Sequence, residues 1–223
     1  MEIQNELRAR VSIEPLAPVS TVAGVDCAFG EAHVFAMAVV WDVDAGAVVE
    51  TRALRRPLQF PYVPGLLSFR EAPALIAVLR RVRSPFDAVL CDGQGLAHPR
   101  RLGLACHLGV LLDKPAVGCA KSRLVGEYAE PGLERGEIAD LRHRDERVGA
   151  VLRTRTGVRP LFVSPGHRCD LPGAIELVLR CGAGFRLPEP VRLADRGVAA
   201  FKKRQIAREL ELQSGGPAST IRP

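Results

Sequence analysis

The stretch FDAVLCDGQGLAHPRR at residues 86–101 decides which fold the chain is predicted to have. Its apolar run 88–91 is too short for a buried helix and consists of small or branched residues, which is typical of a strand buried on both faces. Asp92 follows directly, at the carboxyl end of that strand, where open α/β sheets place their ligands. Gly93 and Gly95 would let the backbone turn with positive φ and approach a ligand closely. The stretch therefore predicts a site at the edge of a sheet.

An ordinary turn also explains part of this stretch, because Asp before Gly at the end of a strand is a common turn signal. A dinucleotide-binding loop fits less well, since a third glycine at the required spacing is missing and Pro99 interrupts the expected helix start. The rest of the chain has to decide between a turn and a site.

The segments around this stretch alternate between strand and helix patterns, as in an α/β protein. Short turns separate three apolar runs that predict an antiparallel meander. Further buried strands and amphipathic helices follow from length and apolar spacing, and Pro73 suits the first turn of its helix. The expected strands are 21–29, 34–41, 47–54, 88–91 and 114–120, and the expected helices lie within 2–12, 73–82, 102–113 and 172–180.

The remaining segments are interpreted as follows. Residues 123–147 are rich in charge and glycine and read as a surface excursion. Residues 148–153 and 158–163 flank a turn and read as a hairpin. From Pro188 the chain is basic and poor in large apolar residues, and we expect disorder from about residue 213.

Composition limits the class of protein. The 223 residues suit a single domain over 1–223, and the net charge of +6 suits a polyanionic partner without proving one. No basic and apolar leader opens the chain, and its longest apolar run, 34–41, is too short for a bilayer, so we expect a cytoplasmic protein that binds no membrane.

The cysteines are far apart and mostly within apolar stretches, which indicates reduced core residues rather than disulfides or a zinc site. They are Cys27, Cys91, Cys106, Cys119, Cys169 and Cys181.

Two acids now stand out. Asp26 lies inside the apolar run 21–29, where a charge is costly unless it is paired or binds a cation. Asp92 ends the strand 88–91. With three meander strands followed by helix, strand, helix and strand, this pattern resembles the ribonuclease H-like fold, an α/β fold with a mixed central sheet flanked by helices. The resemblance implies that both acids converge on adjacent parallel strands and that a third acid, Glu71, joins them.

Short motifs narrow the resemblance to the endonuclease V family, the deoxyinosine-directed repair nucleases. They occur in consistent order between about Val22 and Asp195, and only Val63, where isoleucine is common, departs from the pattern. The motifs are PYVPG at 61–65, FRE at 69–71, DGQG at 92–95, HPRR at 98–101, GLA at 103–105 with HLG at 107–109, GCAKS at 118–122 and SPGHR at 164–168.

The resemblance implies a role for each candidate residue. Asp26 and Asp92 would bind the metal, Glu71 would be the third acid, and His167 would complete the catalytic site together with Lys121. Carboxylates suit this chemistry, because divalent cations activate water and neutralise charge during attack on a phosphodiester. The resemblance also implies a set of substrate-binding residues. These are the wedge Tyr62, the base-pocket glycines Gly65, Gly93 and Gly95, and His98 near the scissile strand.

Each of these residues also has a simpler explanation. Ser68 and Glu71 match a helix capping box. Tyr62 could cap the core with its ring, His167 could be an exposed loop histidine, and Lys121 could be a solvated charge at a strand end.

The resemblance implies a monomeric Mg²⁺-dependent endonuclease, with Mn²⁺ as a substitute, acting on inosine-containing DNA. It would hydrolyse the second phosphodiester 3′ to deoxyinosine and leave 3′-hydroxyl and 5′-phosphate ends. One alternative is an inosine-specific endoribonuclease, because a pocket built of backbone does not distinguish DNA from RNA. Another is a non-catalytic nucleic-acid-binding protein on the same fold. The acids argue against a non-catalytic binding protein, because without a metal their negative charge would repel the substrate.

Overall fold

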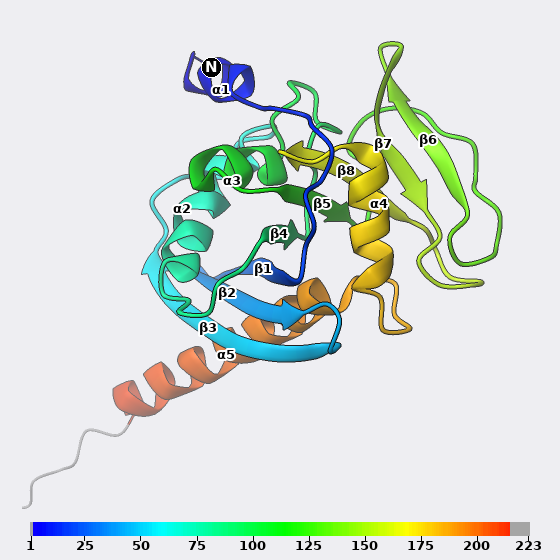
Figure 1. The fold of residues 1–223 in the computed structure, drawn as a ribbon. Coiled ribbons are helices and arrows are strands. Elements are labelled where there is room, and N and C mark those ends of the chain that lie inside the picture. Colours follow the sequence, from blue (N-terminus) through cyan, green and yellow to red (C-terminus); the bar gives the residue numbers. More distant parts are fainter. Residues whose placement is uncertain (1, 215–223) are drawn as a thin grey trace, which may run out of the picture.

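A computed structural model describes residues 2–214, and an eight-stranded sheet organises them (Figure 1). The strand order across the sheet is β3-β2-β1-β4-β5-β8-β7-β6. The strands are β1 (Thr21–Phe29), β2 (His33–Asp42), β3 (Ala47–Pro57), β4 (Ala88–Cys91), β5 (Ala116–Ala120), β6 (Ile138–His143), β7 (Glu146–Leu152) and β8 (Leu161–His167).

The sheet is mixed. β1, β2 and β3 form the predicted antiparallel meander, while β1, β4 and β5 are parallel neighbours. β8 then pairs antiparallel with β5, and β7 and β6 continue in the antiparallel sense. The predicted ribonuclease H-like α/β class is confirmed, with its parallel strands at the centre of the sheet, where both faces are covered.

Helices cover both faces of the sheet. α2 and α3 pack on one face, against Ala23, Val25 and Val89, and α4 and α5 pack on the other, against Val22 and Leu90. α1 lies outside this arrangement, on α3. The helices are α1 (Glu2–Ala9), α2 (Leu67–Leu79), α3 (Leu104–Leu112), α4 (Leu171–Arg180) and α5 (Glu189–Ser214).

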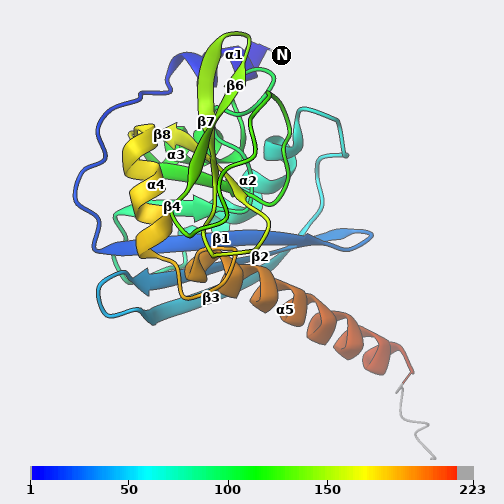
Figure 2. The same cartoon turned by 90° about the vertical axis from the view of Figure 1, so that its right-hand side faces the viewer.

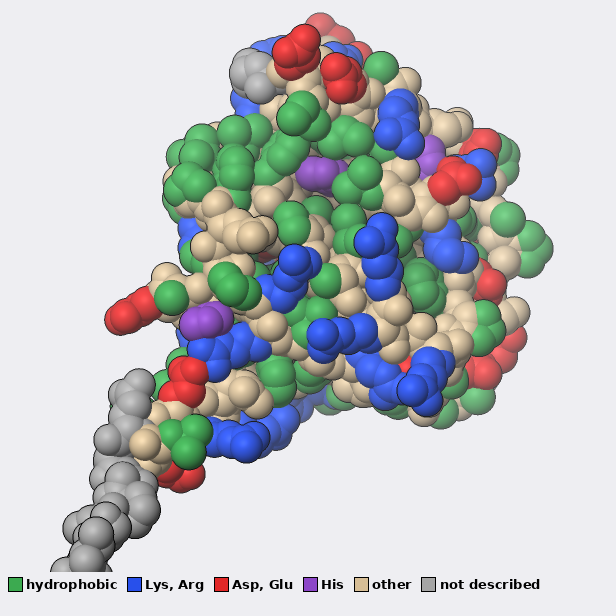
Figure 3. Space-filling view, turned by 90° about the vertical axis from the view of Figure 1, so that its left-hand side faces the viewer, with side chains coloured by type: hydrophobic (Ala, Val, Ile, Leu, Met, Phe, Trp, Pro, Cys, Tyr) green, Lys and Arg blue, Asp and Glu red, His purple; other side chains and the backbone are tan. Residues whose placement is uncertain are grey.

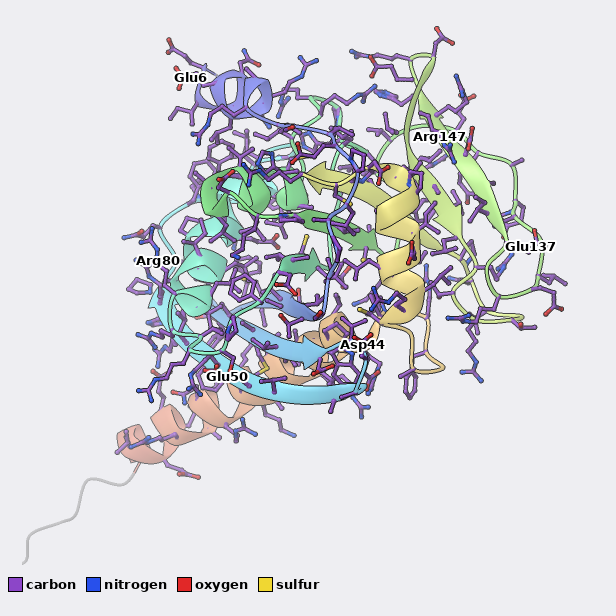
Figure 4. The ribbon with its side chains drawn as sticks, in the orientation of Figure 1. Glu6, Asp44, Glu50, Arg80, Glu137 and Arg147 are labelled. Carbon is purple, nitrogen blue, oxygen red and sulfur yellow. The ribbon has the colours of Figure 1, made fainter. Side chains whose placement is uncertain are left out.

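α2 differs from its prediction. It begins at Leu67 rather than at Pro73, so this proline lies inside the helix and not in its first turn. Burial of Leu75 and Val78 against the sheet outweighs the helix-breaking tendency of proline. The carboxylate of Glu50 on β3 accepts the N–H groups of Arg83 and Ser84, at 3.0 and 2.6 Å, and so ties the chain after α2 to the sheet edge; Figure 4 shows Glu50 on β3.

Two predicted irregular segments are regular in the structure. The excursion 123–147 contains β6, which pairs with β7. The basic segment after Pro188 is α5, which packs on β1 and β2 through Val191, Ala194 and Val198 and then projects beyond the sheet (Figure 2). Small apolar residues on one face hold this helix, which is why its low content of large apolar residues was misleading. Residues 213–214, expected to be disordered, are helical, and 215–223 lie outside the described residues.

The cysteines have the predicted surroundings. Cys91, Cys106, Cys119, Cys169 and Cys181 are buried and Cys27 is half-buried, all as free thiols. In the described part of the chain, no helix combines the length and apolar character needed to cross a membrane.

Candidate active site

Asp26 and Asp92 lie side by side at one edge of the sheet. β1 and β4 are parallel with Val25 opposite Cys91, so the two acids occupy the next position on adjacent strands. Side chains alternate between faces along a strand, and Val22 and Leu90 place this set on the face covered by α5. The prediction that the two carboxylates converge is therefore confirmed by the register.

Glu71 reaches the same place from α2. Its carboxyl interacts electrostatically with both Asp26 and Asp92. The capping-box explanation fails, because the N-cap residue is Leu66 without a side-chain cap, and the Ser68 hydroxyl is instead 3.0 Å from Nδ1 of His107. Glu71 therefore belongs to the acidic cluster.

The acidic cluster has raised pKa values. Burial, followed by the neighbouring Asp92, raises the pKa of Asp26 from 3.8 to about 7. Burial, then Asp26 and Asp92, raises the pKa of Glu71 from 4.5 to about 8. Burial also raises the pKa of Asp92, although Lys121 opposes it. Such a cluster resists full ionisation of its acids, and a bound cation would favour their charged forms.

Lys121 is ion-paired directly with the acidic cluster, on which Arg70 and Arg186 also act electrostatically. Directly after β5, its Nζ lies 2.6 Å from Oδ2 of Asp92 and 2.9 Å from Oδ2 of Asp195. Burial lowers the pKa of Lys121, but these two carboxylates outweigh it and raise that pKa to about 12. The solvated strand-end explanation is therefore wrong, because Lys121 bridges two acids of the site.

Asp195 is the site residue that the sequence analysis missed. It comes from the first half of α5, pairs with Lys121, and raises the pKa of both Asp26 and Asp92. The helix can approach β1 because Gly24 has no side chain; a Cβ there would lie 2.2 Å from the backbone carbon of Pro190. Asp195 closes the motif-bearing region, but no local signal singled it out, because the apolar face of α5 consists of small residues such as Ala194 and Val198.

His167 does not join the site. β8 runs antiparallel to β5, so His167 pairs with Ala116, at the opposite end of β5 from Lys121. Its Nδ1 accepts the N–H of Ser12 at 3.1 Å, and its Nε2 lies 3.5 Å from Oδ1 of Asp113. Nor is it an exposed loop histidine, because it is buried. The structure corrects the sequence prediction that His167 completes the catalytic site. Asp195, and not His167, lies beside Asp26 and Asp92.

A cavity of about 390 Å³ opens beside the acids. Glu71, Asp92 and Lys121 form one side of it, and the predicted substrate-binding residues Tyr62, Gly65, Gly93 and His98 also line it. Gln94, Ser122 and Leu124 are among the further lining residues and were not predicted as site residues. The Gln94 amide donates a 2.9 Å hydrogen bond to the carbonyl of Ser122.

Gly95 is absent from this lining. Its N–H donates to the Ser164 hydroxyl at 2.7 Å, and a Cβ would lie 2.0 Å from the carbonyl oxygen of Pro165. Neither Gly93 nor Gly95 has a left-handed φ. These glycines are therefore needed for close packing and not for the positive φ expected from the sequence.

Tyr62 lies at the mouth of the cavity, and His98 lies in its wall. Tyr62 is 64% exposed, which excludes a role as a core cap. His98 is buried, and burial together with Arg100 lowers its pKa to about 4, so its ring is neutral at pH 7. The site thus offers an exposed aromatic ring and a neutral imidazole beside the acids.

The donors fit a hard divalent cation. Among residues 2–214, no three His, Cys, Asp or Glu side chains are arranged to hold a metal by themselves. Mg²⁺ does not require three protein ligands, because it binds through one or two carboxylates and keeps several waters. Asp26 and Asp92 supply such a pair, in surroundings that disfavour their bare negative charge.

The fold and the acidic cluster define a nuclease of the ribonuclease H-like class. A family model described as Endonuclease V matches residues 5–196. The chain belongs to the endonuclease V family and is an endonuclease, as its motifs predicted.

Relatives cover most of the chain. Endonuclease V of Geotalea uraniireducens (strain Rf4) is 52% identical over 92% of this chain and 88% of its own length. The Endonuclease V structure from Streptomyces avermitilis superposes with a TM-score of 0.88 at 43% identity, covering 92% of each chain. Endonuclease V of Ciona intestinalis, solved with a 24mer DNA containing an inosine followed by a ribo-adenosine, gives 0.81 at 28% identity, covering 91% of this chain and 96% of that chain.

Proposed function

We propose that this endonuclease cuts inosine-containing DNA with the help of Mg²⁺, for which Mn²⁺ can substitute, at the second phosphodiester 3′ to the lesion. The observation that carries the proposal is the convergence of Asp26, Glu71 and Asp92 beside a cavity of about 390 Å³. The Ciona intestinalis relative, solved with inosine-containing DNA, supports the substrate class.

Asp26 and Asp92 would hold the metal, with Asp195 close enough to act on both. When bound, the metal would activate water and neutralise charge on the leaving oxygen. Lys121 keeps Asp92 and Asp195 in place through its two ion pairs. The partly exposed ammonium of Lys121 also presents positive charge where a scissile phosphate would arrive.

We propose that Glu71 carries a proton in the site. Its pKa of about 8 keeps its carboxyl mostly protonated near pH 7 while no cation is present. A group whose pKa lies near the working pH can both release and accept a proton. We assign Glu71 to proton transfer beside the reacting phosphate.

Tyr62 and the cavity would recognise the lesion. An enzyme that reads a base from its edge has to take that base out of the stack, and a cavity of this size is typical of sites that enclose a small ligand. The exposed Tyr62 ring at the mouth would replace the lost stacking. Neutral His98 and the backbone of Gly93 would contact the everted base.

Positive charge outside the site would hold the rest of the duplex. The net charge is +6, and Lys and Arg side chains gather on the face on which α2 and β3 lie (Figure 3). β3 carries Arg52, Arg55 and Arg56, of which Arg52 is ion-paired with Glu50 and Arg55 with Glu209. Cationic side chains bind phosphates without regard to sequence, so this surface suits an enzyme that searches DNA for rare lesions.

The test uses purified protein with Mg²⁺ and matched oligonucleotides, with and without one inosine, as DNA and as RNA. We expect one cut in the inosine-containing DNA, at the second bond 3′ to inosine, with 3′-hydroxyl and 5′-phosphate ends. Cutting of the unmodified strand at an equal rate would refute inosine recognition. Cutting confined to the RNA would make the chain an endoribonuclease.

A further inference from the structure

The loop that carries Tyr62 is anchored at Gly65. This glycine has a left-handed φ of +76°, and a Cβ on it would lie 2.6 Å from Nη2 of Arg100. The N–H of Leu66 donates to the carbonyl of Val63 at 2.9 Å and closes a turn just behind the tyrosine. The position of the Tyr62 loop therefore depends on what holds Gly65.

Two side chains from distant parts of the chain hold the Gly65 carbonyl. Nη2 of Arg100 donates to it at 2.7 Å and Nε2 of Gln4 donates to it at 3.2 Å. Nε of Arg100 also donates to Oε1 of Gln4, so the three groups form a closed triangle of hydrogen bonds. His98 of the cavity wall also interacts with the Gly65 backbone, which raises the pKa of the His98 ring and so opposes the effect of burial.

Gln4 comes from α1, which is fixed to the body of the protein. Gln4 is 1% exposed, and Leu7, one turn later, packs against Leu102, Cys106 and Val110. A buried amide with both ends hydrogen-bonded is costly to disturb, because each lost partner leaves a desolvated polar group. The Gln4 amide is therefore fixed between Arg100 and the Gly65 carbonyl.

We infer that Gln4 and Arg100 are positioning residues for base recognition: through the Gly65 carbonyl they hold the Tyr62 loop at the mouth of the cavity. α1 thereby becomes part of the recognition machinery, and Gln4 lies just before the region, residues 5–196, that the family model matches. The inference rests on the proposed function, because it assigns the loop to lesion recognition.

The experiment compares Gln4→Met, which keeps the side-chain length without its polar atoms, with the matched control Asn5→Met on the exposed side of α1. For inosine-containing duplex we expect Gln4→Met to raise KM about tenfold, equivalent to about 1.4 kcal/mol. We expect kcat to stay within about twofold, because the loop does not touch the reacting phosphate. On single-stranded inosine substrate, where less opening is needed, the rise in KM should be smaller.

Gln4→Glu keeps an oxygen that accepts from Arg100 but loses the donor to the Gly65 carbonyl, so it should recover only part of the lost affinity. A purely structural role would lower the melting temperature and leave the ratio of duplex to single-strand KM unchanged, and that result would overturn the inference. A fall in kcat at constant KM would overturn it as well.

Hydrogen–deuterium exchange separates this inference from the proposed function, because it needs no substrate. The amide of Leu66 should exchange faster in Gln4→Met than in the wild type or in Asn5→Met. Equal exchange in all three would refute the anchoring. Wild-type protein that fails to cut inosine-containing DNA would instead refute the proposed function, whatever the exchange shows.

Discussion

Asp26→Asn should make the metal-free protein more stable while abolishing cleavage. The pKa of Asp26 rises from 3.8 to about 7 on folding, mainly because the carboxyl is buried and next because Asp92 is near. The native state then binds more protons than the unfolded state between these two values. Stability is therefore lost as pH rises from about 4 to about 7, and the loss is complete above that range.

The size of the effect follows from the same shift. A rise from 3.8 to about 7 is about 3 pH units, and at 1.36 kcal/mol per unit this is about 4 kcal/mol at pH 8. At pH 5 the native carboxyl is still protonated. The stability lost between the unfolded-state pKa of 3.8 and pH 5 is then only about 1.6 kcal/mol. The asparagine amide also loses solvation on burial, so we expect a net gain of about 2 kcal/mol at pH 8 and about zero at pH 5.

Urea unfolding in EDTA at pH 5 and pH 8 measures this difference. Glu31→Gln, which removes an exposed carboxyl on the β1–β2 turn, is the matched control and should change stability at neither pH. Adding Mg²⁺ at pH 8 should raise the melting temperature of the wild type and leave that of Asp26→Asn unchanged. If Asp26→Asn were no more stable than the wild type at pH 8, or gained equally at both pH values, the electrostatic account of the site would be refuted.

Four further substitutions test individual residues. Tyr62→Ala should weaken binding to inosine-containing duplex about 5- to 150-fold, and less on single strands; equal losses in binding titrations would contradict the wedge role. His167→Ala should lower the free energy of unfolding by about 1–2 kcal/mol and leave the cleavage rate unchanged, whereas loss of cleavage would return it to the site. Asp195→Ala should raise the Mg²⁺ concentration needed for half-maximal rate about 10- to 100-fold, and an unchanged Mg²⁺ titration would exclude it. Glu71→Gln should slow cleavage strongly without lowering the melting temperature; a lower melting temperature with unchanged cleavage would support the capping-box explanation instead.

Much of the sheet and half of the site could be predicted because they depend on local patterns. A carboxylate inside an apolar run needs an explanation, so Asp26 stood out, and parallel pairing then placed Asp92 beside it. His167 was misplaced because a motif names a residue without giving strand direction, and only the antiparallel pairing of β8 with β5 moves it to the far end. α5 was missed because Ala194 and Val198 are too small to produce a strong apolar signal.

The anchoring of Gly65 could not be predicted from the sequence at all. Gln4 and Gly65 are far apart in the chain, and nothing in the spacing of either indicates that they meet. These hydrogen bonds require that α1 is packed on α3. Local sequence patterns carry no information about long-range polar contacts of this kind.

The docking of α5 on β1 also has a consequence for the synthesis of the protein. Asp26, Glu71, Asp92 and Lys121 are all present in a nascent chain well before Asp195 emerges from the ribosome. Until α5 has left the exit tunnel and settled over Gly24, Lys121 lacks its second carboxylate partner and the helix that covers this face of the sheet is missing. The acids of the site and Lys121 are therefore synthesised before the helix that completes their surroundings.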